Sequence, residues 1–253
     1  MASARRWSAR ALSKDPKRPI EGSVCATVWP TRALASDARW FDEMYLWTEG
    51  FRASTTQRAQ IQITALEHAF YMLESEQVDQ VGVTLSFGTV ERFLDQVVAV
   101  FEAHALLTHR VVVMLRGSVE RLRSRYRVRA FIEHLRGQKA LVGYRIPSSR
   151  IATELKALNF VQPDFAKLLA PGSSHLESWQ DLVLEAQVAG VPPEWMIVSG
   201  LEKPEQVALA RQVGIPFGQG SAVHPPYAPE VQMPIGTTVF EKEGLLFPDL
   251  LLV

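Results

Sequence analysis

The sequence predicts an α/β protein: a single modified TIM (β/α)8 barrel with an antiparallel first strand. Two observations predict this class. Apolar runs of strand length recur along the chain, and segments with helical periodicity separate most of them. Eight such strands in a chain of about 250 residues fit the usual size of a β/α barrel. The 253 residues are 47% hydrophobic and 21% charged, which is enough for one large core.

The opening pair of strands explains the antiparallel start. Apolar runs at 23–30 and 43–47 have no helical segment between them, whereas parallel neighbours need a long crossover. A helix through 63–73 follows the pair. The remaining expected strands are 80–86, 110–115, 140–144, 159–163, 196–199 and 215–219.

Helices are expected between the later strands because apolar residues recur there at helical spacing. The segment 90–101 forms one apolar face, and the segment 128–135 forms another, with Gly137 placed to end that helix. Two more helices are expected at 177–189 and 203–212. The alternate arginines from Arg121 to Arg129 are best explained as a solvated helix face, with an anion or acidic-partner site as the alternative.

The first 20 residues differ from the rest of the chain. They carry six Lys and Arg against one Asp and show no apolar periodicity, so we expect a flexible basic arm over 1–20 and a single domain over 21–253. An organellar transit peptide and an arm that touches nucleic acid are alternatives. A solvated tail is the preferred interpretation.

Composition excludes several classes of function. Lys plus Arg and Asp plus Glu both total 27, so the overall charge favours no nucleic-acid partner. No apolar run approaches the roughly 20 residues that cross a bilayer, so no membrane partner is expected. The single cysteine, Cys25, rules out an intrachain disulfide and fits a reducing compartment. A cytoplasmic location is the resulting expectation.

Two motifs toward the end of the chain resemble those of a known family. The stretch "IVSGLEKPEQ" (197–206) is similar to "IAEGVETxEQ" of EAL domains, and "GIPFGQGSAVHPP" (214–226) is similar to their "GxxxxQGYxFxxP". Both stand in the family's order and at its spacing. The matching residues are Gly200, Glu202, Gln206, Gln219, Gly220 and Pro226.

Over roughly residues 23–226 the chain therefore resembles an EAL domain. EAL domains are bacterial β/α barrels whose active members hydrolyse the signalling dinucleotide cyclic di-GMP with bound divalent metals. The resemblance implies an EAL-type barrel and a place in cyclic di-GMP signalling.

The same resemblance implies that the metal ligands are lost. Thr84 stands where the family has a metal-binding asparagine, and Met114 and Gly117 of "VVVMLRGS" stand where it has two glutamates. Ser199 replaces a third glutamate. No residue from 140 to 149 is acidic, although the family has "ALDDFGTGYSS" there.

Two further family positions involve the lysine and the signature glutamate. "FVQPD" stands where the family has "LKID", which implies that Gln162 replaces the lysine that activates water and that Asp164 matches the aspartate. "EMYLW" is the best match to the signature "EALxR". It retains Glu43 but places Trp47 where a phosphate-contacting arginine belongs.

These replacements together argue against hydrolysis. A two-metal phosphodiesterase needs several hard oxygen ligands on each ion, and the methionine sulfur is a soft ligand. We therefore expect no catalytic residue, no metal and no cofactor. The remaining candidates, as remnants of the family's ligand site, are Glu43, Gln162, Asp164, Ser199, Glu202 and Gln219.

The resulting hypothesis is a catalytically inactive EAL-like regulatory protein of bacterial signalling. It would act by binding another protein, whose identity the residues do not give. A receptor that binds cyclic di-GMP without cutting it is the first alternative, and Trp47 argues against it. A barrel enzyme of different chemistry is the second.

Overall fold

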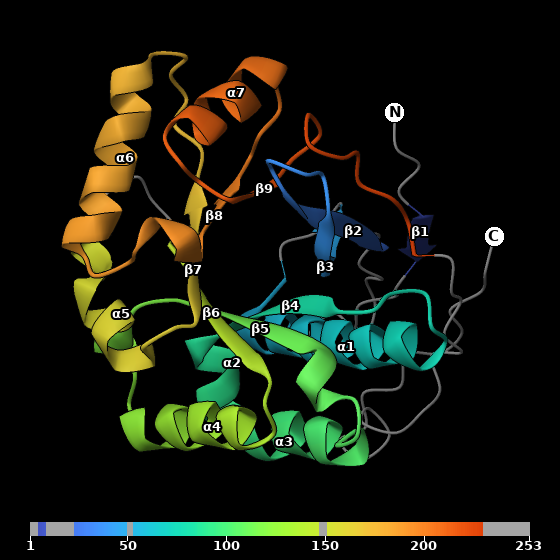
Figure 1. The fold of residues 1–253 in the computed structure, drawn as a ribbon. Coiled ribbons are helices and arrows are strands. Elements are labelled where there is room, and N and C mark those ends of the chain that lie inside the picture. The colour runs from blue at the N-terminus through green and yellow to red at the C-terminus, as the bar shows by residue number, and fades with distance from the viewer. Residues whose placement is uncertain (1–4, 9–22, 50–52, 147–150, 230–253) are drawn as a thin grey trace.

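A computed structural model describes residues 5–8, 23–49, 53–146 and 151–229 of the chain. Within these residues, nine strands form one sheet in sequence order from β1 to β9, and β2 also pairs with β9. Strands β2 to β9 thereby close into a barrel of eight, as the sequence predicts. Helices pack around the later strands, whereas no helix lies between β2 and β3 in the chain (Figure 1).

The strands have the following bounds. They are β1 Arg5–Ser8, β2 Ser23–Ala33, β3 Arg39–Glu49, β4 Val81–Ser86, β5 Val111–Arg116, β6 Leu141–Arg145, β7 Phe165–Leu169, β8 Met196–Ser199 and β9 Phe217–Gln219. Every pair from β3–β4 to β8–β9 is parallel. Strand β2 is antiparallel to both of its barrel neighbours, β3 and β9, so the expected antiparallel start is confirmed.

The helices follow the expected alternation. They are α1 Thr55–Glu74, α2 Phe87–Arg92, α3 Leu94–Ala103, α4 Arg125–Gly137, α5 Leu155–Val161, α6 Leu176–Val188 and α7 Pro204–Gln212. The 3-10 helices are Thr108–Arg110, Val119–Arg121, Ile151–Glu154 and Pro193–Trp195. The single helix expected over 90–101 is divided at Phe93, whose backbone leaves the helical region and ends α2 before α3 begins. Gly137 is the last residue of α4 and does not lie beyond it.

The strand expected at 159–163 is wrong. Residues 155–161 form α5, which buries Ala157, Leu158 and Val161 at helical spacing, and Gln162 ends this helix with a left-handed backbone (φ 48°). The strand lies a few residues later, as β7. The sequence obscured β7 because Lys167 interrupts its apolar run.

The expected basic arm is also corrected in part. Residues 5–8 form β1, which pairs antiparallel with residues 23–26 of β2. The prediction of an arm without secondary structure is therefore wrong for this segment. The rest of the expected arm lies outside the described residues.

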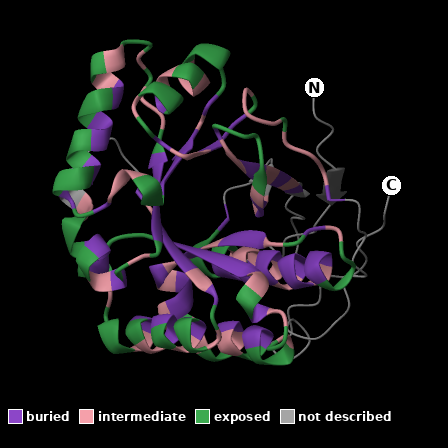
Figure 2. Cartoon of the chain, viewed as in Figure 1, coloured by how far each residue is buried: buried purple, intermediate pink, exposed green. Residues whose placement is uncertain are grey.

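The barrel has two packed layers. Outward-facing residues of the strands pack against the buried faces of the helices, while the outer helix faces are exposed (Figure 2). Inside the barrel, Phe41, Val112, Met114, Phe165 and Ile197 form a second apolar cluster. Among the described residues, no helix combines the length and apolar character needed to span a bilayer.

Candidate functional site

The barrel interior is apolar at one level and polar at the next. Phe41 of β3 and Phe165 of β7 belong to the internal apolar cluster. Side chains two residues apart on a strand point to the same side, so Glu43 and Lys167 also face inward, one step nearer the C-terminal mouth. In β/α barrels this mouth carries the functional groups.

Glu43 and Lys167 form a buried ion pair at the centre of the barrel. The Lys167 Nζ contacts the Glu43 Oε2, and the exposed fractions of the two side chains are 1% and 0%. The Lys167 Nζ also donates to the Gln219 Oε1 and, at 3.0 Å, to the Tyr45 Oη. Thr84 Oγ1 donates to the other carboxylate oxygen of Glu43 at 2.7 Å. Both oxygens of this carboxylate therefore have partners.

Gln219 connects this pair to the first barrel strand. Its Nε2 donates to the Trp29 carbonyl at 3.0 Å and to Thr31 Oγ1 and Glu43 Oε2, both at 3.3 Å. The Gln219 amide thus accepts a hydrogen bond from Lys167 and donates hydrogen bonds to β2. Strands β2, β3, β7 and β9 therefore meet in one polar network, which we call the Glu43–Lys167 network.

Burial and pairing act in opposite directions on the pKa of Glu43. Burial raises the pKa, but the Lys167 ammonium and hydrogen bonds from Lys167, Tyr45 and Thr84 outweigh it, so the pKa is lowered and the carboxylate is ionised at neutral pH. The pKa of Lys167 is lowered, first by burial and then by the nearby Arg145, against the opposing effect of Glu43. Burial and the charge of Glu43 raise the pKa of Tyr45, which stays protonated.

Lys167 changes the interpretation of the family lysine. Strand β7 spans 165–169, and Lys167 is the charged residue within it. Gln162 caps α5 and precedes this strand, so it does not lie at the mouth where the sequence interpretation put it. The signal that could have found Lys167 is a lone charge in a buried run, because such charges are paired.

Gln162 and Asp164 lie at the opposite end of the barrel from the mouth. Both precede β7, and both are exposed. The Asp164 Oδ2 accepts from the backbone N–H of Val142 at 2.7 Å, and the Gln162 carbonyl accepts from Arg136. These contacts hold α4 and β6 to the start of β7, and neither residue joins the Glu43–Lys167 network.

Ser199 and Glu202 stand at the end of β8. Ser199 is buried, and its Oγ donates to the Leu168 carbonyl on the neighbouring strand at 2.9 Å. Glu202 is exposed in the loop after β8, where its backbone N–H and that of Lys203 donate to the Gln206 side chain at the start of α7. Of the six sequence candidates, the structure brings only Glu43 and Gln219 into direct contact.

The barrel interior is also filled beside Gly143, which lies in the stretch that the resemblance aligns with "ALDDFGTGYSS". At Gly143 of β6, a Cβ atom would lie 2.5 Å from the Phe165 ring and 3.0 Å from the Met114 sulfur. A carboxylate side chain has no room there unless the ring moves. Within the described residues, no group of three or more His, Cys, Asp and Glu side chains could hold a metal ion.

Arginines, in contrast, gather at the mouth. The pKa of Arg116, at the end of β5, is lowered by partial burial and by the positive charges of Arg145 and Arg58, whereas Tyr45 acts in the opposite direction. The sequence did not reveal this group because its members come from α1, β5 and β6. The mouth is therefore rich in positive charge.

Comparison with known proteins assigns the fold. No protein-family model matches the sequence, and no curated protein matches it. Solved EAL domains do match. The EAL domain of Mycobacterium smegmatis DcpA is 13% identical with a TM-score of 0.61, and the match covers 81% of this chain and 93% of that chain.

Two structures solved with cyclic di-GMP show the same likeness. The Xanthomonas citri FimX EAL domain is 15% identical with a TM-score of 0.60, covering 83% of this chain and 90% of that one. Vibrio cholerae LapD, in an S helix–GGDEF–EAL chain, is 15% identical with a TM-score of 0.61, covering 78% of this chain but 52% of its own, about half its length. The described chain thus has the EAL-type barrel fold.

Proposed function

We propose that this protein is an EAL-fold regulatory domain of cyclic di-GMP signalling that does not hydrolyse the dinucleotide and acts through a partner protein. One observation carries the proposal: the Lys167 ammonium neutralises Glu43 inside the barrel. Thr84 donates to Glu43, and Met114 and Gly143 are its successive neighbours across the sheet.

Coordination chemistry supports the absence of hydrolysis. Divalent ions in phosphodiesterases are held by several hard oxygen ligands, and two ions share the attacking and leaving oxygens. A cation at Glu43 would have to displace the Lys167 ammonium. Met114, the strand neighbour of Thr84, offers only a sulfur, which is a poor ligand for Mg²⁺ or Mn²⁺.

Hydrolysis is tested directly. Pure protein is incubated with cyclic di-GMP and either Mg²⁺ or Mn²⁺, and the products are separated by chromatography, with an active EAL phosphodiesterase as the positive control. We expect no linear dinucleotide above the protein-free level. Metal-dependent cleavage that Lys167→Met abolishes would overturn the proposal, whereas cleavage unchanged by this substitution would indicate a contaminant.

Exposed apolar side chains on α6 support action through a partner. Leu184 and Val188 lie one helical turn apart and are 59% and 79% exposed. Contiguous exposed apolar surface marks interaction sites, and this pair is the candidate that α6 offers. We expect Leu184→Ser with Val188→Ser to abolish capture of a partner that the unmodified chain retains, while Leu106→Ser, at another exposed leucine, leaves capture unchanged.

A cyclic di-GMP receptor is the second candidate, because Arg116 and Arg145 place positive charge at the mouth. FimX and LapD were solved with this dinucleotide bound. Calorimetry with cyclic di-GMP, with and without Mg²⁺, separates the candidates. Binding at micromolar ligand that Arg145→Gln weakens would favour the receptor. Absence of any heat of binding would favour the regulatory domain that acts through a partner protein.

A further inference from the structure

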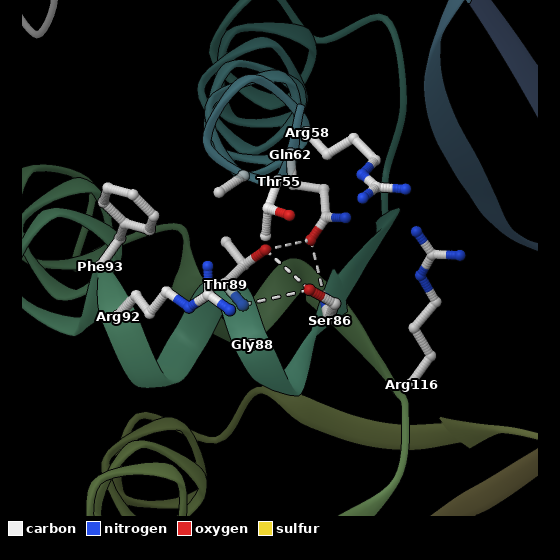
Figure 3. A pocket seen from close by; sticks show the side chains of 10 residues that line it. Thr55, Arg58, Gln62, Ser86, Gly88, Thr89, Arg92, Phe93 and Arg116 are labelled. Atoms are coloured by element: carbon white, nitrogen blue, oxygen red, sulfur yellow. Dashed lines mark hydrogen bonds between the residues drawn. The ribbon is translucent and has the colours of Figure 1, made fainter. Parts of the chain in front are cut away.

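A pocket beside the barrel mouth contains three arginines. It has a volume of about 230 Å³ and lies between α1, α2 and the end of β5 (Figure 3). Arg58 comes from α1, Arg92 from α2 and Arg116 from β5. None of the ten lining residues is acidic. We call this cavity the arginine pocket.

The positive charge of the arginine pocket is uncompensated within the described chain. Some surface cations have carboxylate partners, such as Arg127 with Asp95 at 3.7 Å and Lys156 with Glu120. No described carboxylate pairs with any of the three pocket arginines. Arg58 moreover lies near enough to act on Arg116 electrostatically, in the direction that disfavours its charge. An anion in the pocket would remove this repulsion.

Gln62 adds a fixed hydrogen-bond donor. Its Oε1 accepts from the Ser86 backbone N–H at 2.7 Å and from Thr89 Oγ1 at 2.8 Å. The Ser86 hydroxyl in turn lies 2.8 Å from Thr89 Oγ1. Because the oxygen already has two donors, the orientation of the amide is set, and its nitrogen faces the side where Arg58 and Arg116 lie (Figure 3).

We propose that the arginine pocket binds a phosphoryl group. Guanidinium groups match the oxygens of phosphate with paired N–H donors, and the Gln62 amide supplies another donor. The volume is below the roughly 300–1,000 Å³ of sites for drug-sized ligands, so the ligand is small. Inorganic phosphate and the phosphate monoester of a small metabolite share this chemistry. The inference goes beyond the proposed function and does not depend on it.

Calorimetry at low ionic strength tests the pocket with two probes, inorganic phosphate and glycerol 3-phosphate. We expect saturable binding of at least one probe, and the tighter probe identifies the source of the phosphoryl group. Arg58→Gln and Arg116→Gln should each weaken binding about tenfold or more, as the loss of a charge-assisted contact does. Arg123→Gln removes an exposed arginine outside the pocket and should leave binding unchanged.

Gln62→Glu is the sharper variant. Its carboxylate keeps the two acceptor contacts to Ser86 and Thr89 and exchanges the donor for a negative charge beside the arginines. We expect it to abolish binding of both probes while the melting temperature stays equal or rises, which separates loss of binding from loss of folding. Absence of binding of both probes to the unmodified chain, or equal weakening by Arg123→Gln, would overturn the proposal.

Discussion

At the level of single residues, the Glu43–Lys167 pair joins two strands that are 124 positions apart in the chain. Removing charges from water is costly, and only their mutual attraction and the added hydrogen bonds offset this. Thr84, Tyr45 and Gln219 supply those bonds. Loss of one partner leaves the other buried, charged and uncompensated.

A double-mutant cycle tests this coupling. We expect Glu43→Leu and Lys167→Met each to lower the free energy of unfolding by roughly 3–5 kcal/mol, because each leaves a buried charge without its partner. The double variant should lose much less than the sum of the two. Urea denaturation measures all three variants, and additive losses would show that the pair is not coupled.

Ser199 gives a second test at the residue scale. Ser199→Glu places a carboxylate in a buried position whose hydroxyl now bonds to the Leu168 carbonyl, so we expect a neutral or destabilising effect of up to a few kcal/mol. Ser199→Gln, of the same size without the charge, is the control. Thermal melts with and without Mn²⁺ measure both. A rise with Mn²⁺ confined to the glutamate variant would reveal a surviving cation site.

At the level of elements, the long helix α1 carries a buried histidine. Ser54 and Gln57 form a capping box at its start, and His68 lies on its buried face with an exposed fraction of 3%. Burial lowers the pKa of His68 to about 4, against an ordinary value of 6.5. Folding therefore keeps this imidazole neutral over a pH range in which the unfolded chain protonates it.

The pH dependence of stability follows from this shift. Because the pKa of His68 is lower in the folded state, its contribution to the free energy of unfolding is complete above pH 6.5. This contribution is lost as the pH falls toward 4, and the total loss is about 3 kcal/mol. His68→Asn should flatten the stability curve over this range relative to the unmodified chain. His109→Asn, at an exposed histidine, should leave the slope unchanged. Denaturation at pH 7, 6, 5 and 4.5 measures it.

The elements show what the sequence can predict. Continuous apolar runs located β4, β5 and β8, and the missing helix between the first two runs predicted the antiparallel pairing of β2 with β3. Strand β7 was missed because Lys167 is stabilised by Glu43, a partner distant in sequence. That error placed Gln162 and Asp164 at the mouth. The arginine pocket was also beyond sequence reasoning, since its arginines belong to three elements.

At the level of the whole molecule, the barrel closes where β2 meets β9. The pairing runs from Arg32 with Gly218 to Ala33 with Phe217, and Val28 bridges to Tyr227. At Gly218 a Cβ atom would lie 2.5 Å from Leu34 and 2.7 Å from Leu201. Any larger residue at this position would therefore have to displace the ends of two leucine side chains at the closure.

Gly218→Ala tests this expectation. We expect a loss of about 1–3 kcal/mol in the free energy of unfolding, because the added methyl group crowds a packed seam. Amide hydrogen exchange should also accelerate in β9 more than in β5. Gly172→Ala, where a Cβ atom would meet nothing within 4 Å, is the matched control. Equal effects at the two positions would contradict the assignment of the seam.

The β2–β9 seam also has a consequence for synthesis. Trp29 and Gln219 are 190 residues apart, and their bond belongs to the network inside the barrel. At ribosomal rates of about 5–20 residues per second, β2 waits roughly 10–40 s for β9, its second neighbour in the barrel, to be made. During that interval the part of its edge that β1 does not cover is open to strands of other chains. A nascent chain stalled before β9 is therefore the species that we expect chaperones to hold.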